Sequence, residues 1–309
     1  MPLTMFNRAK VFATVLAFAR ASRTMRLVIP LTSFGFKPSL ALKLMKPIAL
    51  YSSSFVVVAA ASSLKTSLSV KELKQITKKA DDLYNDNKLE EVLELLRPYK
   101  DDGKEDITWR ISRAAYSLSK SHVISKEKHC SLIEESYEMA KLTLELNENS
   151  ALGHKWMSIA LDAYSSMKGF RHQCATVIPV LNHMLRSIEL DPTDGTVIYM
   201  VGMWYYAIAD LAWYQKRVLE AIAGKPLPAT YEEAFSYFKR AEEISPNFYS
   251  LNLLMLGKCY HKLGDLDSAI SYLQRAMNYP QFSDDDHKAH QEASELLKKL
   301  KVLEHTSSN

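Results

Sequence analysis

The segment that most constrains the fold lies near the C-terminal end, where two helical patterns follow each other closely. Residues 250–279 read SLNLLMLGKCYHKLGDLDSAISYLQRAMNY. Apolar residues recur at helical spacing on both sides of a turn at Gly264. Small residues at Gly257, Ala269 and Ala276 allow two helices to approach closely. The segment therefore predicts an antiparallel helix hairpin.

The same register recurs upstream, so the chain is a helical repeat. The recurring positions, helix pair by helix pair, are Ile198, Gly202 and Tyr205 with Ala234, Phe238 and Ala241; Trp156 and Ala160 with Met184 and Ser187; Trp109 and Tyr116 with Ala140 and Thr143; Ala80 and Leu83 with Val92 and Leu96. Residues 283–303 predict a solvent-facing C-terminal capping helix, which a solenoid needs. The pattern is typical of tetratricopeptide repeats. It predicts an all-α, tetratricopeptide-like antiparallel helical solenoid with irregular insertions.

Composition and motifs argue against several classes of function. Glycine is scarce, and the three cysteines form no CxxC pair, so neither a disulfide framework nor a structural zinc site is expected. The chain has no GxGxxG, P-loop, GxSxG or HExxH motif. The nearest metal candidate, Asp284–His287 with His290, is better explained by aspartates at a helix N-terminus. We therefore predict no catalysis, no cofactor and no metal.

Charge divides the chain into two parts. Ten of the 39 basic residues lie in residues 1–71, which contain no acidic residue. Residues 72–309 consequently hold 29 basic and 35 acidic residues. Binding to phosphate backbones requires clustered positive charge, so a nucleic-acid partner is not expected for this part. The predicted domains are a basic leader, residues 1–69, and a repeat domain, residues 70–309.

The leader allows more than one interpretation. Its apolar run, residues 11–19, is too short to span a bilayer. Arginines, serines and the absence of acid are typical of a mitochondrial targeting segment, which predicts a mitochondrial location. The uncharged residues 47–64 fit either a linker or a weak membrane anchor, so membrane association through this N-terminal segment stays open.

Four stretches carry a family resemblance: HKWMSIAL from residue 154, GMWYYAIADLAWYQKR from 202, YEEAFSYFKRAEEISPNF from 231 and PNFYSLNLLMLGKCYHKLG from 246. They resemble the regulator of microtubule dynamics proteins over about residues 70–300. The resemblance implies tetratricopeptide-like proteins linked to microtubules, spindles and mitochondria. One member tethers the outer mitochondrial membrane to the endoplasmic reticulum and binds phospholipid. The short acidic motif of that tether has no counterpart in residues 1–70.

Two functions follow as hypotheses. The first is a non-catalytic adaptor for protein partners, with microtubules or a spindle component implied by the resemblance and a cytoplasmic, cytoskeletal or spindle location. The alternative is a phospholipid-binding or lipid-transfer module at the mitochondrial surface. Residues 70–309 contain no motif that separates them.

The repeat register also predicts which side chains face a concave groove. This groove is rich in methionine and tyrosine, with cations at one end, and it suits acyl chains or an apolar helix. The protein's own elements, such as the capping helix, could equally fill it. The predicted lining residues are Met157, Leu161, Tyr164, Tyr199, Met203, Tyr206, Lys258, His261 and Lys262.

The segment between Gly202 and Ala234 is longer than its counterpart in the last pair. An apolar stripe predicts one unbroken helix, residues 196–223, roughly 42 Å long and projecting beyond its neighbours. The stripe residues are Trp204, Ile208, Leu211, Val218 and Ile222. We predict that the projecting end meets a partner and that Trp213 stacks on Arg217. The residues of that end are Trp213, Tyr214, Lys216 and Arg217.

Overall fold

The computed structural model describes residues 68–307, with side chains described as far as Leu300. The leader and its predicted targeting and anchor segments lie outside the described residues, apart from its last two positions. Between residues 68 and 307 the regular elements are all helical. They are α2 (Val70–Asn85), α3 (Leu89–Leu96), the short 3-10 helix η1 (Arg97–Tyr99), α4 (Glu105–Ser119), α5 (Lys126–Leu146), α6 (Ala151–Met167), α7 (Phe170–Leu190), α8 (Gly195–Ala209), α9 (Trp213–Ala223), α10 (Tyr231–Ile244), α11 (Ser250–Leu263), α12 (Leu266–Met277) and α13 (Asp284–Ser307).

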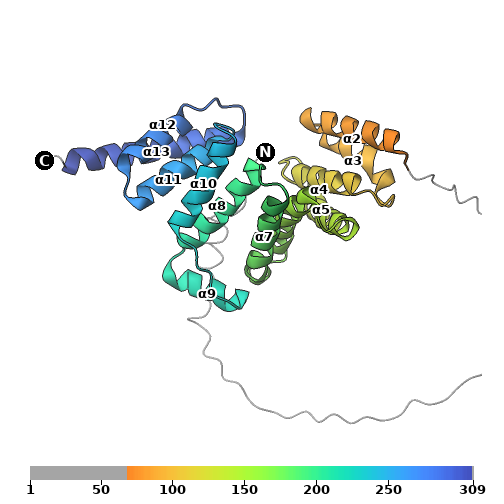
Figure 1. Ribbon diagram of the computed structural model, residues 1–309, viewed down its shortest axis with the longest axis horizontal. Helices are drawn as coiled ribbons and strands as arrows, with labels where there is room; N and C mark the ends of the chain where they lie inside the picture. The colour runs from red at the N-terminus through yellow and green to blue at the C-terminus, as the bar shows by residue number, and fades with distance from the viewer. Residues whose placement is uncertain (1–67, 308–309) are drawn as a thin grey trace, which may run out of the picture.

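The helices pack as successive pairs, which confirms the all-α, tetratricopeptide-like prediction. The pairs are α2 with α3, α4 with α5, α6 with α7, α8 with α10, and α11 with α12. Figure 1 shows them running from α2 and α3 at one end to α12 and α13 at the other. The second helices of two pairs are longer than that of the last pair, since α5 and α7 have 21 residues each whereas α12 has 12.

Local sequence fixes where the helices begin and end. At the start of α10, the Thr230 hydroxyl accepts from the Glu233 amide at 3.1 Å, and the Glu233 carboxylate accepts from the Thr230 amide at 3.0 Å. This reciprocal capping satisfies two amides that have no partner within the helix. Gly264 ends α11 in the left-handed conformation, at φ +88°, which a residue with a side chain adopts only with strain.

The predicted small residues are the points of closest helix contact. A methyl group on Gly257 would lie 2.7 Å from Cγ of Leu273, and one on Gly202 would lie 2.7 Å from Cε1 of Phe238. Both distances are shorter than van der Waals contact. Glycine is therefore required where α11 meets α12 and where α8 meets α10, as the register predicted.

The prediction of one unbroken helix over residues 196–223 is wrong. α8 ends at Ala209, and α9 begins at Trp213 and packs against α7. The predicted stripe also fails, since Trp204 and Ile208 are buried whereas Val218 is exposed.

Two side chains account for the break. The buried Gln215 side chain accepts from the Ala212 amide at 3.0 Å and caps the new helix. Asp210, the last residue before the break, accepts from the Tyr231 hydroxyl at 2.5 Å and pairs with Lys262 at 3.0 Å. The direction change then buries Leu219 on the inner side of α9.

An ion cluster joins the first two helix pairs. Arg110 and Arg113 of α4 both pair with the Asp81 carboxylate of α2, at 2.8 and 2.5 Å. The Arg113 guanidinium also lies 3.8 Å from the ring centroid of Tyr84. Burial alone would raise the pKa of Asp81, but the hydrogen bonds and charges of the two arginines outweigh it and lower that pKa.

Replacing Asp81 with asparagine should lower the free energy of unfolding by about 1–2 kcal/mol at neutral pH, a value reduced for the carboxylate's exposure. That side chain is 34% exposed. Because its pKa is lower in the folded state, its contribution is complete above the unfolded pKa of about 4 and is lost as the pH falls through the folded pKa. Urea unfolding curves of the two proteins should therefore converge in acid. A difference in the free energy of unfolding that stays constant at all pH values would contradict this expectation. The control is Asp82→Asn, since Asp82 lies on the exposed side of α2.

Candidate partner-binding surface

Most of the predicted groove residues contact the protein itself. Met157, Leu161, Tyr199 and Tyr206 are buried, and Tyr164 and Met203 are half-buried. The Tyr164 ring stacks on Tyr137, with centroids 4.5 Å apart. These side chains hold neighbouring helices together, so the first helices offer less free apolar surface than the register predicted.

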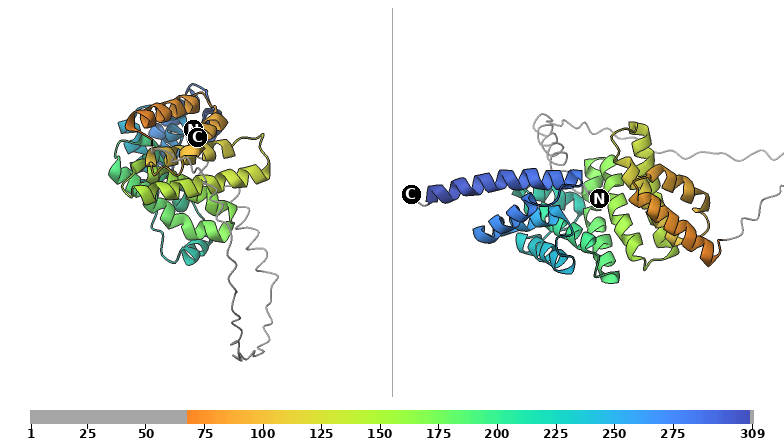
Figure 2. Two further views of the ribbon diagram at one scale, coloured as in Figure 1. Left: turned by 90° about the vertical axis from the view of Figure 1, so that its right-hand side faces the viewer. Right: turned by 90° about the horizontal axis from the view of Figure 1, so that it is seen from above.

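Helix α13 lies over the C-terminal end of the predicted groove. Lys258 of α11 pairs with Glu292 of α13, and the Tyr249 hydroxyl donates to Asp285. The Ser250 hydroxyl donates to Asp286 at 2.6 Å. Figure 2 shows α13 extending along the neighbouring helices. The helix predicted to face solvent therefore has one buried side, formed by Ala289, Ala293, Leu297 and Leu300.

The two lysines assigned to the groove have partners within the protein, whereas Nδ1 of His261 is buried without a hydrogen-bond partner among the described residues. Lys262 pairs with Asp210 and lies 5.1 Å from the ring centroid of Tyr231. His261 lies in the same helix turn and is half-buried. Burial, assisted by the charges of Asp285 and Glu292, raises the pKa of the Tyr199 phenol. This end of the groove is therefore a packed, polar contact between α11, α13 and their neighbours.

Helix α9 presents a different kind of surface. Trp213 is 79% exposed, although tryptophan is highly buried on average. It contacts the exposed Tyr214 edge to face, with centroids 6.0 Å apart. The Arg217 side chain is 80% exposed and lies 3.7 Å from Glu220 instead of stacking on Trp213. We call Trp213, Tyr214, Lys216, Arg217, Val218 and Lys225 the α9 surface.

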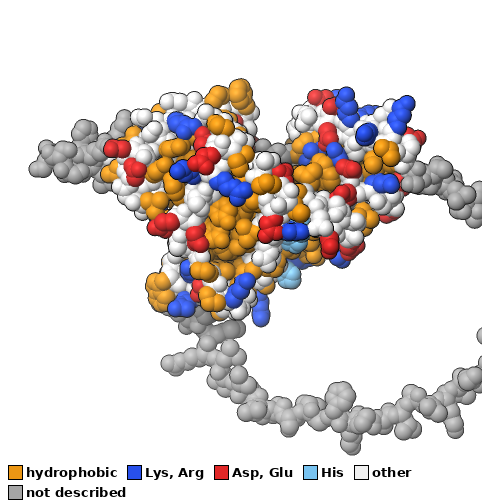
Figure 3. Space-filling view, viewed as in Figure 1, with side chains coloured by type: hydrophobic (Ala, Val, Ile, Leu, Met, Phe, Trp, Pro, Cys, Tyr) orange, Lys and Arg blue, Asp and Glu red, His pale blue; other side chains and the backbone are white. Residues whose placement is uncertain are grey.

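A shallow hollow adjoins the α9 surface. It has a volume of about 450 Å³ and is lined by Arg217, Glu220, Ala221, Gly224, Lys225 and Pro226. The Glu220 carboxylate accepts from the Leu227 amide at 3.0 Å and so holds the return loop. Figure 3 shows hydrophobic and basic side chains next to each other over α9. The surface combines aromatic rings with cations on a helix whose inner side is fixed.

The sequence predicts Trp213, Tyr214, Lys216 and Arg217 as partner-binding residues, but the residues that position them were not predicted. Gln215 lies between them in the sequence yet is buried, and Asp210 joins α8 to α10 and α11. The sequence signal that could have predicted the break is Asp210 followed by Trp213 and Gln215. In this pattern one helix ends at the acidic residue and the glutamine caps the start of the next helix.

Nothing in the described part of the chain has the geometry of a metal centre or a membrane-spanning helix. No three His, Cys, Asp or Glu side chains within it converge on one point. In the former metal candidate, the His290 Nδ1 lies 2.7 Å from the Met277 carbonyl oxygen, and His287 Nδ1 lies 2.6 Å from the Gln281 side-chain oxygen. Within residues 68–307, no helix is long and apolar enough to cross a bilayer.

Comparison with protein families agrees with the resemblance seen in the four sequence stretches. The family model described as "Regulator of microtubule dynamics protein 1-3" matches residues 76–301. The chain belongs to this family.

Individual relatives show the extent of the similarity. The chain is 35% identical to regulator of microtubule dynamics protein 1 of Bos taurus, over 79% of this chain and 77% of that protein. It is 39% identical to the Homo sapiens protein 1, over 61% of this chain and 60% of that protein. Similarity to protein 3 of Xenopus laevis is lower, at 27% identity over 62% of this chain and 42% of that protein.

Solved structures with related folds are tetratricopeptide proteins. TTC0263 of Thermus thermophilus matches with a TM-score of 0.49 and 13% identity, over 72% of this chain and 98% of that one. YrrB matches with a TM-score of 0.42 and 16% identity, over 71% of this chain and 90% of that one. The fold class rests on the helix pairs described above and not on these scores.

Proposed function

We propose that this protein is a non-catalytic helical-repeat adaptor that binds microtubules through the α9 surface. The observation that carries the proposal is the exposed Trp213 next to the exposed Arg217 on a helix that packs against α7. Tryptophan, tyrosine and arginine dominate the energetics of protein interfaces. Membership of a family named for microtubule dynamics supplies the partner.

Charge complementarity supports binding through α9. Residues 72–309 are acidic overall, and the C-terminal tails of tubulin are acidic as well. Lys216, Arg217 and Lys225 supply local positive charge beside the aromatic rings. Such a patch attracts an acidic segment, and the rings then provide contact area. A cytoskeletal or spindle location follows from this binding, whereas the mitochondrial location remains an expectation from the leader's composition.

The decisive experiment is co-sedimentation of the full chain with stabilised microtubules. The double substitution Trp213→Ala and Arg217→Ala should weaken binding at least about tenfold, because each residue is of a hot-spot type. Binding by the unaltered chain should also weaken with salt. The melting temperature of the double variant should stay within about 2 °C of the parent, since solvent-exposed substitutions cost little.

A matched control replaces Phe282 and Lys288, an exposed aromatic and an exposed cation on another part of the surface. That variant should bind microtubules like the unaltered chain. Failure of the unaltered chain to sediment with microtubules at low salt, or an equal loss in the control, would refute the α9 assignment. Detection of phospholipid bound to the intact chain by native mass spectrometry would favour the lipid-module hypothesis instead.

A further inference from the structure

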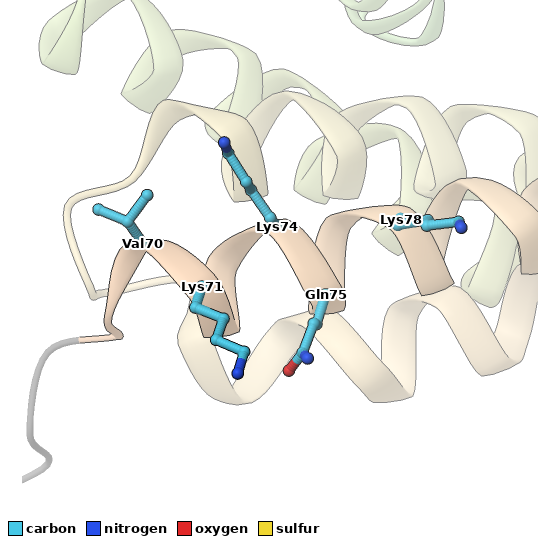
Figure 4. A pocket seen from close by; sticks show the side chains of 5 residues that line it. All are labelled: Val70, Lys71, Lys74, Gln75 and Lys78. Carbon is cyan, nitrogen blue, oxygen red and sulfur yellow. The ribbon is translucent and has the colours of Figure 1, made fainter.

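A second exposed surface lies on α2, at the N-terminal end of the solenoid. Lys71, Lys74 and Lys78 are exposed along this helix, with Val70 just before them and Gln75 between Lys74 and Lys78, as Figure 4 shows. The five residues line a shallow hollow of about 550 Å³. We call them the α2 lysine face.

The opposite side of α2 packs into the hydrophobic core. Leu73 and Ile76 pack against the N-terminal hydrophobic cluster, and Thr77 and Ala80 are buried. Because α2 is the first helix of the described solenoid, no preceding described helix covers its outer side (Figure 1). The lysine face is thus held rigidly and turned outward.

The acidic residues of α2 do not neutralise the lysine face. Asp81 is engaged by two arginines of α4, and Glu72 closes the capping box with Ser69 at the helix start. Asp82 lies one turn beyond Lys78, at the C-terminal end of the helix. Among the described residues, none of the three lysines forms an ion pair.

The sequence next to α2 indicates what covers the face. No acidic residue occurs in residues 1–71, so the preceding segment cannot offer complementary charge. The uncharged residues 47–64 end only six positions before α2. Lysine clusters adjacent to an apolar stretch, or along an amphipathic helix, bind anionic lipid.

We propose that the α2 lysine face docks on an anionic phospholipid bilayer. The three ammonium groups meet lipid phosphates and carboxylates, while their aliphatic stems and Val70, which is 73% exposed, lie against the headgroup region. This assigns the protein a second surface, separate from α9. The two surfaces would allow one chain to contact a membrane and a protein filament together.

The test is flotation of the full chain with phosphatidylcholine vesicles, with and without phosphatidylserine. The parent chain should bind the anionic vesicles more strongly, and salt should weaken that binding. Lys71→Gln, Lys74→Gln and Lys78→Gln together should reduce binding to the anionic vesicles by at least about tenfold, since each lysine near such a surface contributes appreciably.

The matched control is Lys288→Gln, Lys298→Gln and Lys299→Gln, three exposed lysines of α13 with the same loss of charge. This control should bind vesicles like the parent. An equal loss in both triple variants, or no loss in the α2 variant, would overturn the proposal.

The two proposals fail separately. The α2 triple variant should still sediment with microtubules, and the Trp213 and Arg217 double variant should still bind vesicles. If the α2 variant instead loses microtubules and keeps the vesicles, the lysine face serves tubulin and membrane docking by α2 is wrong.

Discussion

Replacing Phe238 with alanine is expected to lower the free energy of unfolding by about 3–5 kcal/mol. Phe238 of α10 is completely buried against α8, and its ring centroid lies 5.7 Å from that of Tyr199. Domains have only about 5–15 kcal/mol of stability in total, so the variant should show a much earlier transition in urea.

Phe282→Ala is the matched control, because that ring is 89% exposed. It should change the free energy of unfolding by less than about 0.5 kcal/mol. Gly202 gives a sharper check, since its missing side chain makes room for the Phe238 ring. Gly202→Ala should destabilise the parent but stabilise the Phe238→Ala variant, where the clash is gone and alanine favours the helix. Additive effects would contradict the proposed contact.

Removing α13 by ending the chain after Ser283 should have the second large effect. Its two buried leucines and two buried alanines alone account for roughly 5 kcal/mol of burial. Deletion also leaves Tyr249, Ser250 and Lys258 without their carboxylate partners. We expect an early, less cooperative thermal transition and stronger binding of a hydrophobic dye.

The double substitution Leu297→Ala and Leu300→Ala keeps the helix but removes its large side chains, and it should reproduce much of the loss. Because α13 lies over one end of the groove, individual phospholipid molecules should be retained in native mass spectrometry by the shortened chain and not by the intact one. Phospholipid retained in this way by the intact chain would show that α13 does not close the groove. A transition unchanged by deletion would mean that α13 is dispensable for stability.

The helix pairs were predictable because their contacts are local in the repeat. Gly257 facing Leu273 and Gly202 facing Phe238 follow from spacing alone, since a small residue must stand opposite a large one where helices touch. The exposure of Trp213 was consistent with its expected place outside the core. The break between α8 and α9 was not predicted, because the apolar residues continue at helical spacing through residues 210–212.

Sequence alone determined the fold class, the helix pairing and the uneven distribution of charge, with no acidic residue before Glu72. These follow from periodicity, small residues at contacts and charge, which are properties of the chain itself. Tertiary structure alone decided that α9 folds back on α7 through Gln215 and Asp210, and that α13 covers the end of the groove. Apart from the local cap formed by Gln215, both depend on partners distant in the sequence, whose burial and hydrogen bonds outweigh local helical preference.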